Sequence, residues 1–226
     1  MDTESLNWTQ PGIVGVGVVG GAVRNYFELQ GIKPLLYDRF SGLGSLDEVN
    51  EADVIYVCVP TPYVSGRGFD DSAVIDALSR LSGEKLVVVK STVVPGTTEK
   101  LQRIFPQHHL LFNPEFLREA SANDDFLTPD RQIVGYCEGG ESLAQAVLET
   151  LPRAPHESVV PASVAEMTKY ATNSFLAMKV IFANELFDLC ETLGVDYELV
   201  KQGFGVDAQL PSLAQALDEH IEILVV

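Results

Sequence analysis

The stretch IVGVGVVG, residues 13–20, decides the fold of this chain. Ile13–Val16 is predicted as a strand and Val18–Leu29 as the helix that follows it. Glycines stand at positions 15, 17 and 20 between and within them. The first allows a tight turn, the second lets a ligand approach the backbone, and the third allows close packing of helix on strand. The pattern predicts a dinucleotide site with the pyrophosphate at the helix N-terminus, although glycines that serve only the turn remain an alternative.

Short β-branched runs and helical stretches alternate through the first 160 residues. This alternation predicts an α/β fold with a Rossmann-type doubly wound parallel sheet, a domain that we place at residues 1–160. The connection at residues 39–52 is short and leaves room for only an abbreviated crossover. Further expected strands are Leu35–Asp38, Val54–Val59, Leu86–Lys90, Leu110–Asn113, Ile133–Tyr136 and Ser158–Val160, and further expected helices are Ser72–Leu81, Thr97–Ile104 and Ser142–Leu151.

Asp38 ends the second expected strand. A carboxylate at this position bonds the adenosine ribose hydroxyls of a bound dinucleotide, and it repels a 2′-phosphate. The sequence therefore favours NAD over NADP, a preference that the neighbouring Arg39 weakens.

The residues after Pro161 have a different character. Ser163 and Glu166 have the spacing of a capping box, and Gly194 stands where a helix C-terminal cap is expected. Between them, apolar residues recur every three to four positions, so we predict one helix on the order of 45 Å long. Such a helix predicts a small all-α domain at residues 161–226 and a homodimer formed through residues 164–193, with packing on its own domain as the alternative.

Composition excludes several classes of partner. The chain has 15 Lys and Arg against 32 Asp and Glu, a net charge of −17. This charge argues against binding nucleic acid or an anionic membrane surface. The three cysteines have no metal-like spacing, so neither a disulfide framework nor a zinc site is predicted. No secretory signal or membrane-spanning run is recognisable, and we expect a cytoplasmic protein.

Hydroxyl side chains follow two of the expected strands. Thr61 lies in VCVPTP, and Ser91 and Thr92 lie in KSTVVPGTT. The carboxyl ends of parallel strands are where ligands bind, so these hydroxyls are candidates for contact with the cofactor. Helix capping is the alternative, above all for Ser91.

Two polar pairs complete the candidate site. Glu115 and Glu119 are four residues apart and would share a face if they lay on one helical turn, where paired carboxylates could activate a water. Lys169 and Asn173 have the same spacing on the long helix, and a desolvated lysine could polarise an oxygen or accept a proton. A solvated acidic loop and an ordinary surface lysine are the alternatives.

These segments together resemble the UDP-glucose/GDP-mannose 6-dehydrogenase family. The similarity runs over about residues 12 to 207 and rests on VGVGVVG, VCVPTP, KSTVVPGTT, NPEFLREASANDDF, PDRQIVG and AEMTKYATNSFLAMKVIFANE. The resemblance implies oxidation of the sugar C6 alcohol of a nucleotide sugar with NAD, and a central helical domain that dimerises.

The resemblance also assigns roles to residues. It implies that Gly15, Gly17, Gly20, Asp38, Thr61, Thr92 and Glu119 bind NAD. It implies that Thr92 and Glu115 position a water, that Phe116 and Leu117 touch the sugar nucleotide, and that Lys169 and Asn173 bind the substrate oxygens.

The chain departs from the family pattern in three places. No GG-x-C-x-x-K-D stretch with the nucleophilic cysteine is present, and none of Cys58, Cys137 and Cys190 is a substitute. Residues 208–211 replace a usual Arg-Ile-Gly run, and residues 212–226 are predicted as an unrelated helix. The nucleotide-binding C-terminal domain is absent, so we expect a shortened chain in which full oxidation to the carboxylate fails for want of a thiolate.

Two other classes of function stay open. The first is a non-catalytic, NAD-binding interaction module that pairs with a full-length dehydrogenase. The second is a dehydrogenase of small 3-hydroxy acids, against which the segment Asn113–Glu119 argues.

Overall fold

The computed structural model describes residues 10–205, and their side chains as far as Gly203. The chain divides into two compact units, with the boundary between Tyr170 and Ala171. The predictions made for residues 208–211 and for a helix at 212–226 lie outside the described residues.

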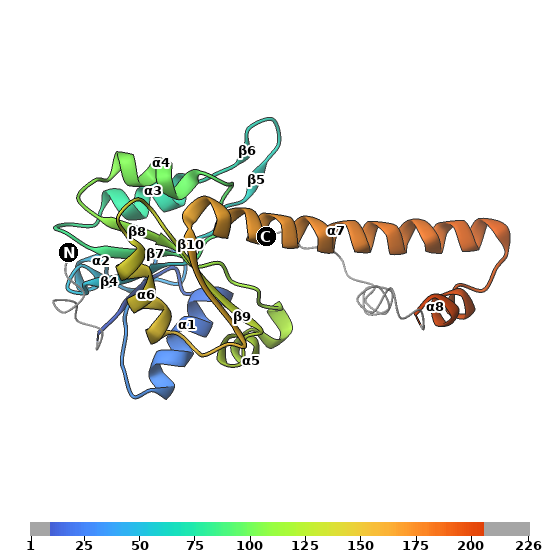
Figure 1. Cartoon of the computed structure of the whole chain (residues 1–226), viewed down its shortest axis with the longest axis horizontal. Helices are drawn as coiled ribbons and strands as arrows, with labels where there is room; N and C mark the ends of the chain where they lie inside the picture. The colour runs from blue at the N-terminus through green and yellow to red at the C-terminus, as the bar shows by residue number, and fades with distance from the viewer. Residues whose placement is uncertain (1–9, 206–226) are drawn as a thin grey trace. The chain divides into compact units, whose positions relative to one another are not determined.

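The first unit is built on an eight-stranded sheet with the order β10-β9-β8-β7-β4-β1-β2-β3. The strand order steps outward on both sides of β1 and β4, as in a doubly wound sheet, and helices lie on both faces (Figure 1). The predicted fold class is confirmed. The strands are β1 (Gly12–Val14), β2 (Leu35–Asp38), β3 (Leu43–Gly44), β4 (Val54–Val57), β7 (Leu86–Val89), β8 (His109–Phe112), β9 (Arg131–Tyr136) and β10 (His156–Pro161).

The sheet is parallel-dominated but mixed, which corrects the purely parallel expectation. β9 runs antiparallel to β8, with Leu111 opposite Tyr136, and β3 runs antiparallel to β2. The segment between β8 and β9 holds only a 3₁₀ turn, η2 (Glu119–Ser121), and the six-residue helix α5 (Ala122–Leu127). A helix of that length rises only about 9 Å, too little to return the chain across a four-residue strand of about 13 Å and begin a parallel strand.

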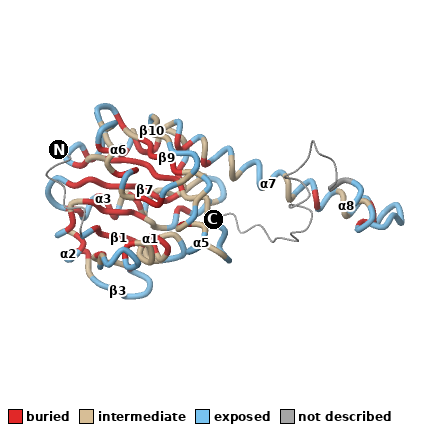
Figure 2. Tube along the Cα trace, turned by 60° about the horizontal axis from the view of Figure 1, so that its bottom comes forward, coloured by how far each residue is buried: buried red, intermediate tan, exposed pale blue. Residues whose placement is uncertain are grey.

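Two apolar cores lie on opposite faces of the sheet. One contains residues of α2 (Leu46–Val49), α3 (Ser72–Ser79) and α4 (Thr97–Ile104), together with Ala165. The other contains residues of α1 (Val18–Leu29), α5 and α6 (Glu141–Thr150). The central strands are buried along their length (Figure 2), which explains their near-continuous apolar sequences.

Several small elements were not predicted. The connection at residues 39–52 contains only β3 and the single-turn helix α2, in keeping with an abbreviated crossover. A two-stranded hairpin, β5 (Tyr63–Val64) and β6 (Gly68–Phe69), follows β4. Its Phe69 ring meets the Tyr63 and Tyr170 rings edge to face, at centroid distances of 6.0 and 6.1 Å.

The long helix α7 (Ala162–Leu193) is present as predicted, with 32 residues. The capping box expected at its start is wrong, because the helix already begins at Ala162. Glu166 instead accepts hydrogen bonds from the Gly96 N–H (2.5 Å) and the Thr98 N–H (2.7 Å), at the N-terminus of α4. This carboxylate is fully buried, and burial raises its pKa.

The second unit contains the rest of α7 and the helix α8 (Tyr197–Gly205). Gly194 ends α7 with a φ of +66°, as the sequence predicts for a C-terminal cap. Ala183, Cys190 and Tyr197 form a small buried cluster. Within residues 10–205, no helix combines the length and apolar character needed to cross a membrane.

Candidate cofactor and substrate site

The three glycines of the first turn each meet a different steric condition. Gly15 has a φ of +87°, and a Cβ there would lie 2.6 Å from the Cys58 carbonyl oxygen. A Cβ on Gly20 would overlap the Gly15 carbonyl oxygen, so this position needs glycine for packing. Gly17 is exposed, and a Cβ there would meet nothing within 4 Å. Open space above Gly17, at the start of α1, is what a pyrophosphate at a helix N-terminus requires.

Asp38 is tied directly to the glycine-rich turn. Its Oδ2 accepts the Val16 N–H at 2.7 Å, and its Oδ1 accepts the Phe40 N–H, the Ser41 N–H and the Ser41 hydroxyl. The hydrogen bonds from the backbone amides of Ser41 and Val16 lower the pKa of Asp38. The carboxylate is therefore ionised at neutral pH. Its Oδ2 accepts one bond in the described chain, and this leaves capacity for a ribose hydroxyl.

The hydroxyl residues lie at the carboxyl edge of β4 and β7. The buried Thr61 hydroxyl donates to the Thr92 carbonyl oxygen at 2.5 Å, and the Ser91 hydroxyl donates to the Val59 carbonyl oxygen at 2.7 Å. These bonds join the ends of the two strands. Ser91 does not cap a helix, since α4 begins at Thr97 with Gly96 as its cap.

Glu115 and Lys169 form an ion pair, which joins the segment after β8 to the first part of α7. The distance from Nζ to Glu115 Oε1 is 2.7 Å, and the two side chains are only 6% and 14% exposed. The other carboxylate oxygen, Oε2, accepts the Leu117 N–H at 2.8 Å. Each charge of this buried pair needs the other, because removal of either partner would leave the remaining charge poorly solvated.

The Phe116 ring lies beside two cations. The Arg131 guanidinium carbon is 3.8 Å from the ring centroid, and the Lys169 Nζ is 5.5 Å from it. Both separations are within the range of cation–π attraction. These contacts hold the ring, and with it the backbone of Phe116 and Leu117, next to the ion pair.

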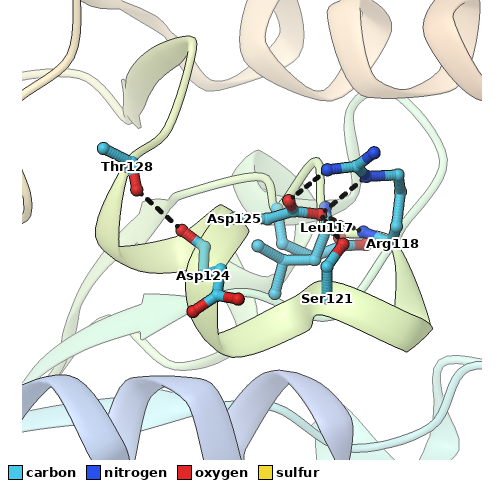
Figure 3. A network of polar contacts seen from close by, with 7 residues as sticks. Leu117, Arg118, Ser121, Asp124, Asp125 and Thr128 are labelled. Carbon is cyan, nitrogen blue, oxygen red and sulfur yellow. Dashed lines mark hydrogen bonds and ion pairs between the residues drawn. The ribbon is translucent and has the colours of Figure 1, made fainter.

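The far end of the same segment is fixed by a clip between Arg118 and Asp125 (Figure 3). The Arg118 Nη2 donates to Asp125 Oδ1 at 2.7 Å and its Nε donates to Oδ2 at 3.1 Å. The Arg118 N–H and the Ser121 hydroxyl also donate to Oδ2. The Arg118 side chain keeps the pKa of Asp125 well below its usual range.

Glu119 does not share a helical turn with Glu115, so that expectation is wrong. Residues 113–118 have no regular structure, and Glu119 begins the 3₁₀ turn η2 as an exposed residue. The hydrogen bond from the Leu117 N–H to the Glu115 carboxylate holds a local turn in place of a helix here. Only Glu115, of the two acids, lies in the ion pair with Lys169.

A buried lysine, Lys90, was not singled out from the sequence. It follows β7, is 3% exposed, and donates from Nζ to Asn113 Oδ1 at 2.6 Å. Burial lowers the pKa of Lys90 to about 8. The sequence shows only that a charged residue directly follows the apolar run Leu86–Val89, which does not distinguish a buried ammonium from an exposed one.

The remaining predicted residues are less informative. Asn173 follows Lys169 by one turn of α7 but belongs to the second unit. Burial raises the pKa of the Cys58 thiol to about 12 and of the Cys137 thiol to about 11, so both are poor nucleophiles at neutral pH. Within residues 10–205, no group of three His, Cys, Asp or Glu side chains is arranged to hold a metal ion.

The sequence matches two domain models of one family. Residues 38–151 match the NAD binding domain of the UDP-glucose/GDP-mannose dehydrogenase family, and residues 163–217 match its central domain. The chain belongs to the UDP-glucose/GDP-mannose dehydrogenase family. The resemblance noted from the sequence motifs is thereby confirmed.

Relatives within the UDP-glucose/GDP-mannose dehydrogenase family are longer than the present chain. The UDP-glucose 6-dehydrogenase of Rhizobium meliloti (strain 1021) is 36% identical over 180 residues, which cover 73% of this chain and 41% of the relative. The UDP-glucose 6-dehydrogenase of Haloferax volcanii is 35% identical over 196 residues, which cover 77% of this chain and 46% of the relative. The chain thus spans less than half the length of these curated relatives.

Solved structures agree with this membership. A UDP-glucose dehydrogenase from the hyperthermophilic archaeon Pyrobaculum islandicum superposes with a TM-score of 0.76 at 30% identity, covering 92% of this chain and 59% of that one. A UDP-N-acetylmannosamine dehydrogenase from Pyrococcus horikoshii gives a TM-score of 0.78 at 20% identity, and this likeness shows the shared fold alone.

Proposed function

We propose that this chain binds NAD and carries the alcohol-oxidising site of a nucleotide-sugar 6-dehydrogenase of the UDP-glucose or GDP-mannose type. The observation that carries the proposal is the buried ion pair of Lys169 with Glu115, next to the carboxyl edge of a doubly wound sheet with an open glycine turn. Family membership and the names of the relatives support it.

The residues of the first turn fit NAD. The turn offers a helix N-terminus whose first amides have no intrahelical partner, and open space stands above Gly17. Asp38 is ionised and retains acceptor capacity, so it would hold the adenosine ribose and disfavour a 2′-phosphate. Thr61 and Thr92 would border the cofactor from the ends of β4 and β7. Bound NAD supplies the acceptor for the hydride that leaves the alcohol carbon.

Lys169 is the group we assign to the substrate oxygen. Its ammonium would donate to the C6 oxygen and stabilise negative charge as the hydroxyl proton is lost. Glu115 would keep Lys169 oriented and could accept a proton or hold a water with Thr92. The family resemblance also assigns Asn173 to the substrate oxygens and the backbone of Phe116 and Leu117 to contact with the sugar nucleotide.

Calorimetric titration tests the cofactor part of the proposal. We expect saturable heat with NAD and binding at least tenfold weaker with NADP, because of the ionised Asp38. An absence of heat at millimolar NAD would contradict the cofactor assignment. Glu119 is exposed on a turn, and Glu119→Gln tests its assignment to the cofactor, which predicts weaker NAD binding.

Formation of NADH tests the activity with UDP-glucose, GDP-mannose and UDP-N-acetylmannosamine. Lys169→Met should abolish NADH formation while leaving NAD affinity unchanged, and Lys33→Met, at an exposed position, serves as its control. A non-catalytic interaction module would bind NAD but yield no NADH with any of these sugars.

The proposal includes a homodimer formed through α7. Phe175, Met178, Ile181 and Leu189 of this helix are each at least half exposed in the single chain. An apolar stripe of this kind is typical of an interface. Light scattering coupled to gel filtration should report twice the mass of 24.6 kDa, and Ile181→Glu should shift it to the monomer.

The proposal also covers domain organisation and compartment. We assign residues 1–160 to the NAD-binding domain and residues 161–226 to part of the central helical domain. The free cysteines 58, 137 and 190 fit a reducing compartment such as the cytoplasm.

A further inference from the structure

The segment that carries Glu115 starts at a buried lysine contact. Lys90 directly follows β7, and its backbone N–H donates to the Val57 carbonyl oxygen at 2.8 Å. Its Nζ donates to Asn113 Oδ1 at 2.6 Å and lies 3.4 Å from the Asn113 carbonyl oxygen. The same Nζ lies 5.3 Å from the centroid of the Phe126 ring. The ammonium is thus enclosed between the ends of β7 and β8 and helix α5.

Asn113 also makes hydrogen bonds to residues of β9. It is fully buried, and its side-chain amide donates to the Ile133 carbonyl oxygen at 2.8 Å and to Gln132 Oε1 at 3.3 Å. Its backbone N–H donates to the Val89 carbonyl oxygen at 2.9 Å. Asn113 therefore links the ends of β7 and β8 to the start of β9, and its side-chain oxygen accepts the hydrogen bond from Lys90.

Asn113 is separated from Glu115 only by Pro114. The proline ring fixes one of the backbone angles between them, so the position of Asn113 largely sets where the Glu115 side chain can reach. Glu115 then meets Lys169 at 2.7 Å. A chain of contacts runs from Lys90 through Asn113 to the ion pair, and every link is at least partly buried.

A lysine at this position needs an explanation that packing does not provide. Transfer of an ammonium group into the interior is costly, and an apolar side chain of the same length would fill the same space. In the described chain, no carboxylate lies within ion-pair distance of Lys90, so the nearest compensation comes from Asn113 and the Phe126 ring. The negative charge of Glu115 adds a longer-range attraction, and the Lys169 ammonium opposes it.

We propose that Lys90 is a positioning residue that holds the Asn113–Glu115 segment in the place from which Glu115 pairs with Lys169. It acts through Asn113 and is not assigned contact with substrate or cofactor. The catalytic meaning of this role rests on the function proposed above, but the contact itself can be tested without any turnover.

The test measures how fast acetic anhydride acetylates the Lys169 amine at pH 7.5, by peptide mass spectrometry with the exposed Lys33 as internal reference. In the wild-type chain the ion pair and burial protect Lys169. We expect Lys90→Met to raise the acetylation rate of Lys169 at least threefold, because Glu115 on the loosened segment no longer pairs with Lys169. We expect Lys90→Arg to restore part of the protection.

Lys85→Met is the matched control. Lys85 flanks the other end of β7, is also buried, and donates from Nζ to the Asn50 carbonyl oxygen at 2.7 Å. Its loss should lower the melting temperature without changing Lys169. Equal Lys169 rates in Lys90→Met, Lys85→Met and the wild type would overturn the proposal, as would an equal rise in both variants.

If Lys90→Met does not fold, Asn113→Ala carries the same test from the acceptor side. It should also raise the Lys169 rate at least threefold, and an unchanged rate would count against the proposal. The outcome is separable from the function proposed above. If the Lys169 acetylation rate rises as expected but the chain neither binds NAD nor forms NADH, only the proposed function is contradicted. If the chain binds NAD but the Lys169 rate does not change, only the role of Lys90 is contradicted.

Discussion

Replacement of Gly20 by alanine should destabilise the first unit while the neighbouring replacement, Gly21→Ala, stabilises it. A Cβ at position 20 would overlap the Gly15 carbonyl oxygen and lie 2.9 Å from the Gly15 carbonyl carbon and 3.3 Å from the Cys58 Cβ. A Cβ at position 21 would meet nothing within 4 Å. Both residues lie in α1, so they share the same helical context.

The size of the effect follows from the obstructing atoms. Overpacking costs about 1–3 kcal/mol, and the upper end applies here because the obstruction is backbone that the Gly15 N–H anchors to the Tyr37 carbonyl oxygen. Alanine in a helix gains about 1 kcal/mol over glycine. Gly20→Ala should therefore lose about 2 kcal/mol of unfolding free energy, or about 4–8 °C in melting temperature for a chain of this size. Gly21→Ala should gain up to about 1 kcal/mol, because it has the helical gain without the obstruction.

Urea unfolding followed by far-UV circular dichroism measures both changes, and NAD titration adds the functional readout. Gly17→Ala should leave the unfolding free energy within about 1 kcal/mol of wild type, because its Cβ meets open space. It should nevertheless weaken NAD binding at least tenfold, since the methyl group occupies the approach to the pyrophosphate. Equal stability of Gly20→Ala and Gly21→Ala would refute the packing argument, and undiminished NAD affinity in Gly17→Ala would refute the placement of the cofactor.

Two further predictions concern charged side chains. Asp125→Asn should cost about 1 kcal/mol, because it weakens the charged bonds from the largely exposed Arg118. Limited proteolysis should then cut residues 118–125 faster than in Asp124→Asn, and equal cutting of the two variants would count against the clip. The unfolding free energy of wild type relative to Lys90→Met should rise by roughly 3 kcal/mol between pH 7 and pH 10.5. The folded pKa of Lys90, about 8, lies below its ordinary value of 10.5, so the unfolded chain binds more protons in that window and stability rises with pH. A pH-independent difference in urea unfolding would contradict the depressed pKa.

The regular elements of the sheet could be predicted because their patterns are local. Leu35–Asp38, Val18–Leu29 and Thr97–Ile104 were placed with the bounds that the structure has, since a proline or glycine directly precedes each of them. The long helix was also placed within a residue at its end. The direction of β9 was not, because it depends on how far a connection can travel, which no window of residues around β9 encodes.

Members of the candidate site could be proposed from the sequence, but the contacts between them could not. Glu115 and Lys169 were named from the sequence, but their pairing joins segments 54 positions apart and could only be seen in three dimensions. Glu119 was grouped with Glu115 on a helical spacing, but the residues from 113 to 118 have no regular structure. Lys90 was passed over because a residue at a strand end has no periodic signature that separates a buried ammonium from an exposed one.

The buried Glu166 has a consequence for the first turns of α7, which belong to the first unit. A carboxylate that could have capped the first turn of its own helix instead accepts hydrogen bonds at the N-terminus of α4, and this fixes the rotation of the first turns of α7 about the helix axis. Lys169 follows Glu166 by three positions and lies on the same face of the helix, so its orientation is fixed with that of Glu166. The direction in which the Lys169 side chain points therefore depends on Glu166. Changes in residues 95–98 would alter that direction without altering any residue beside the lysine.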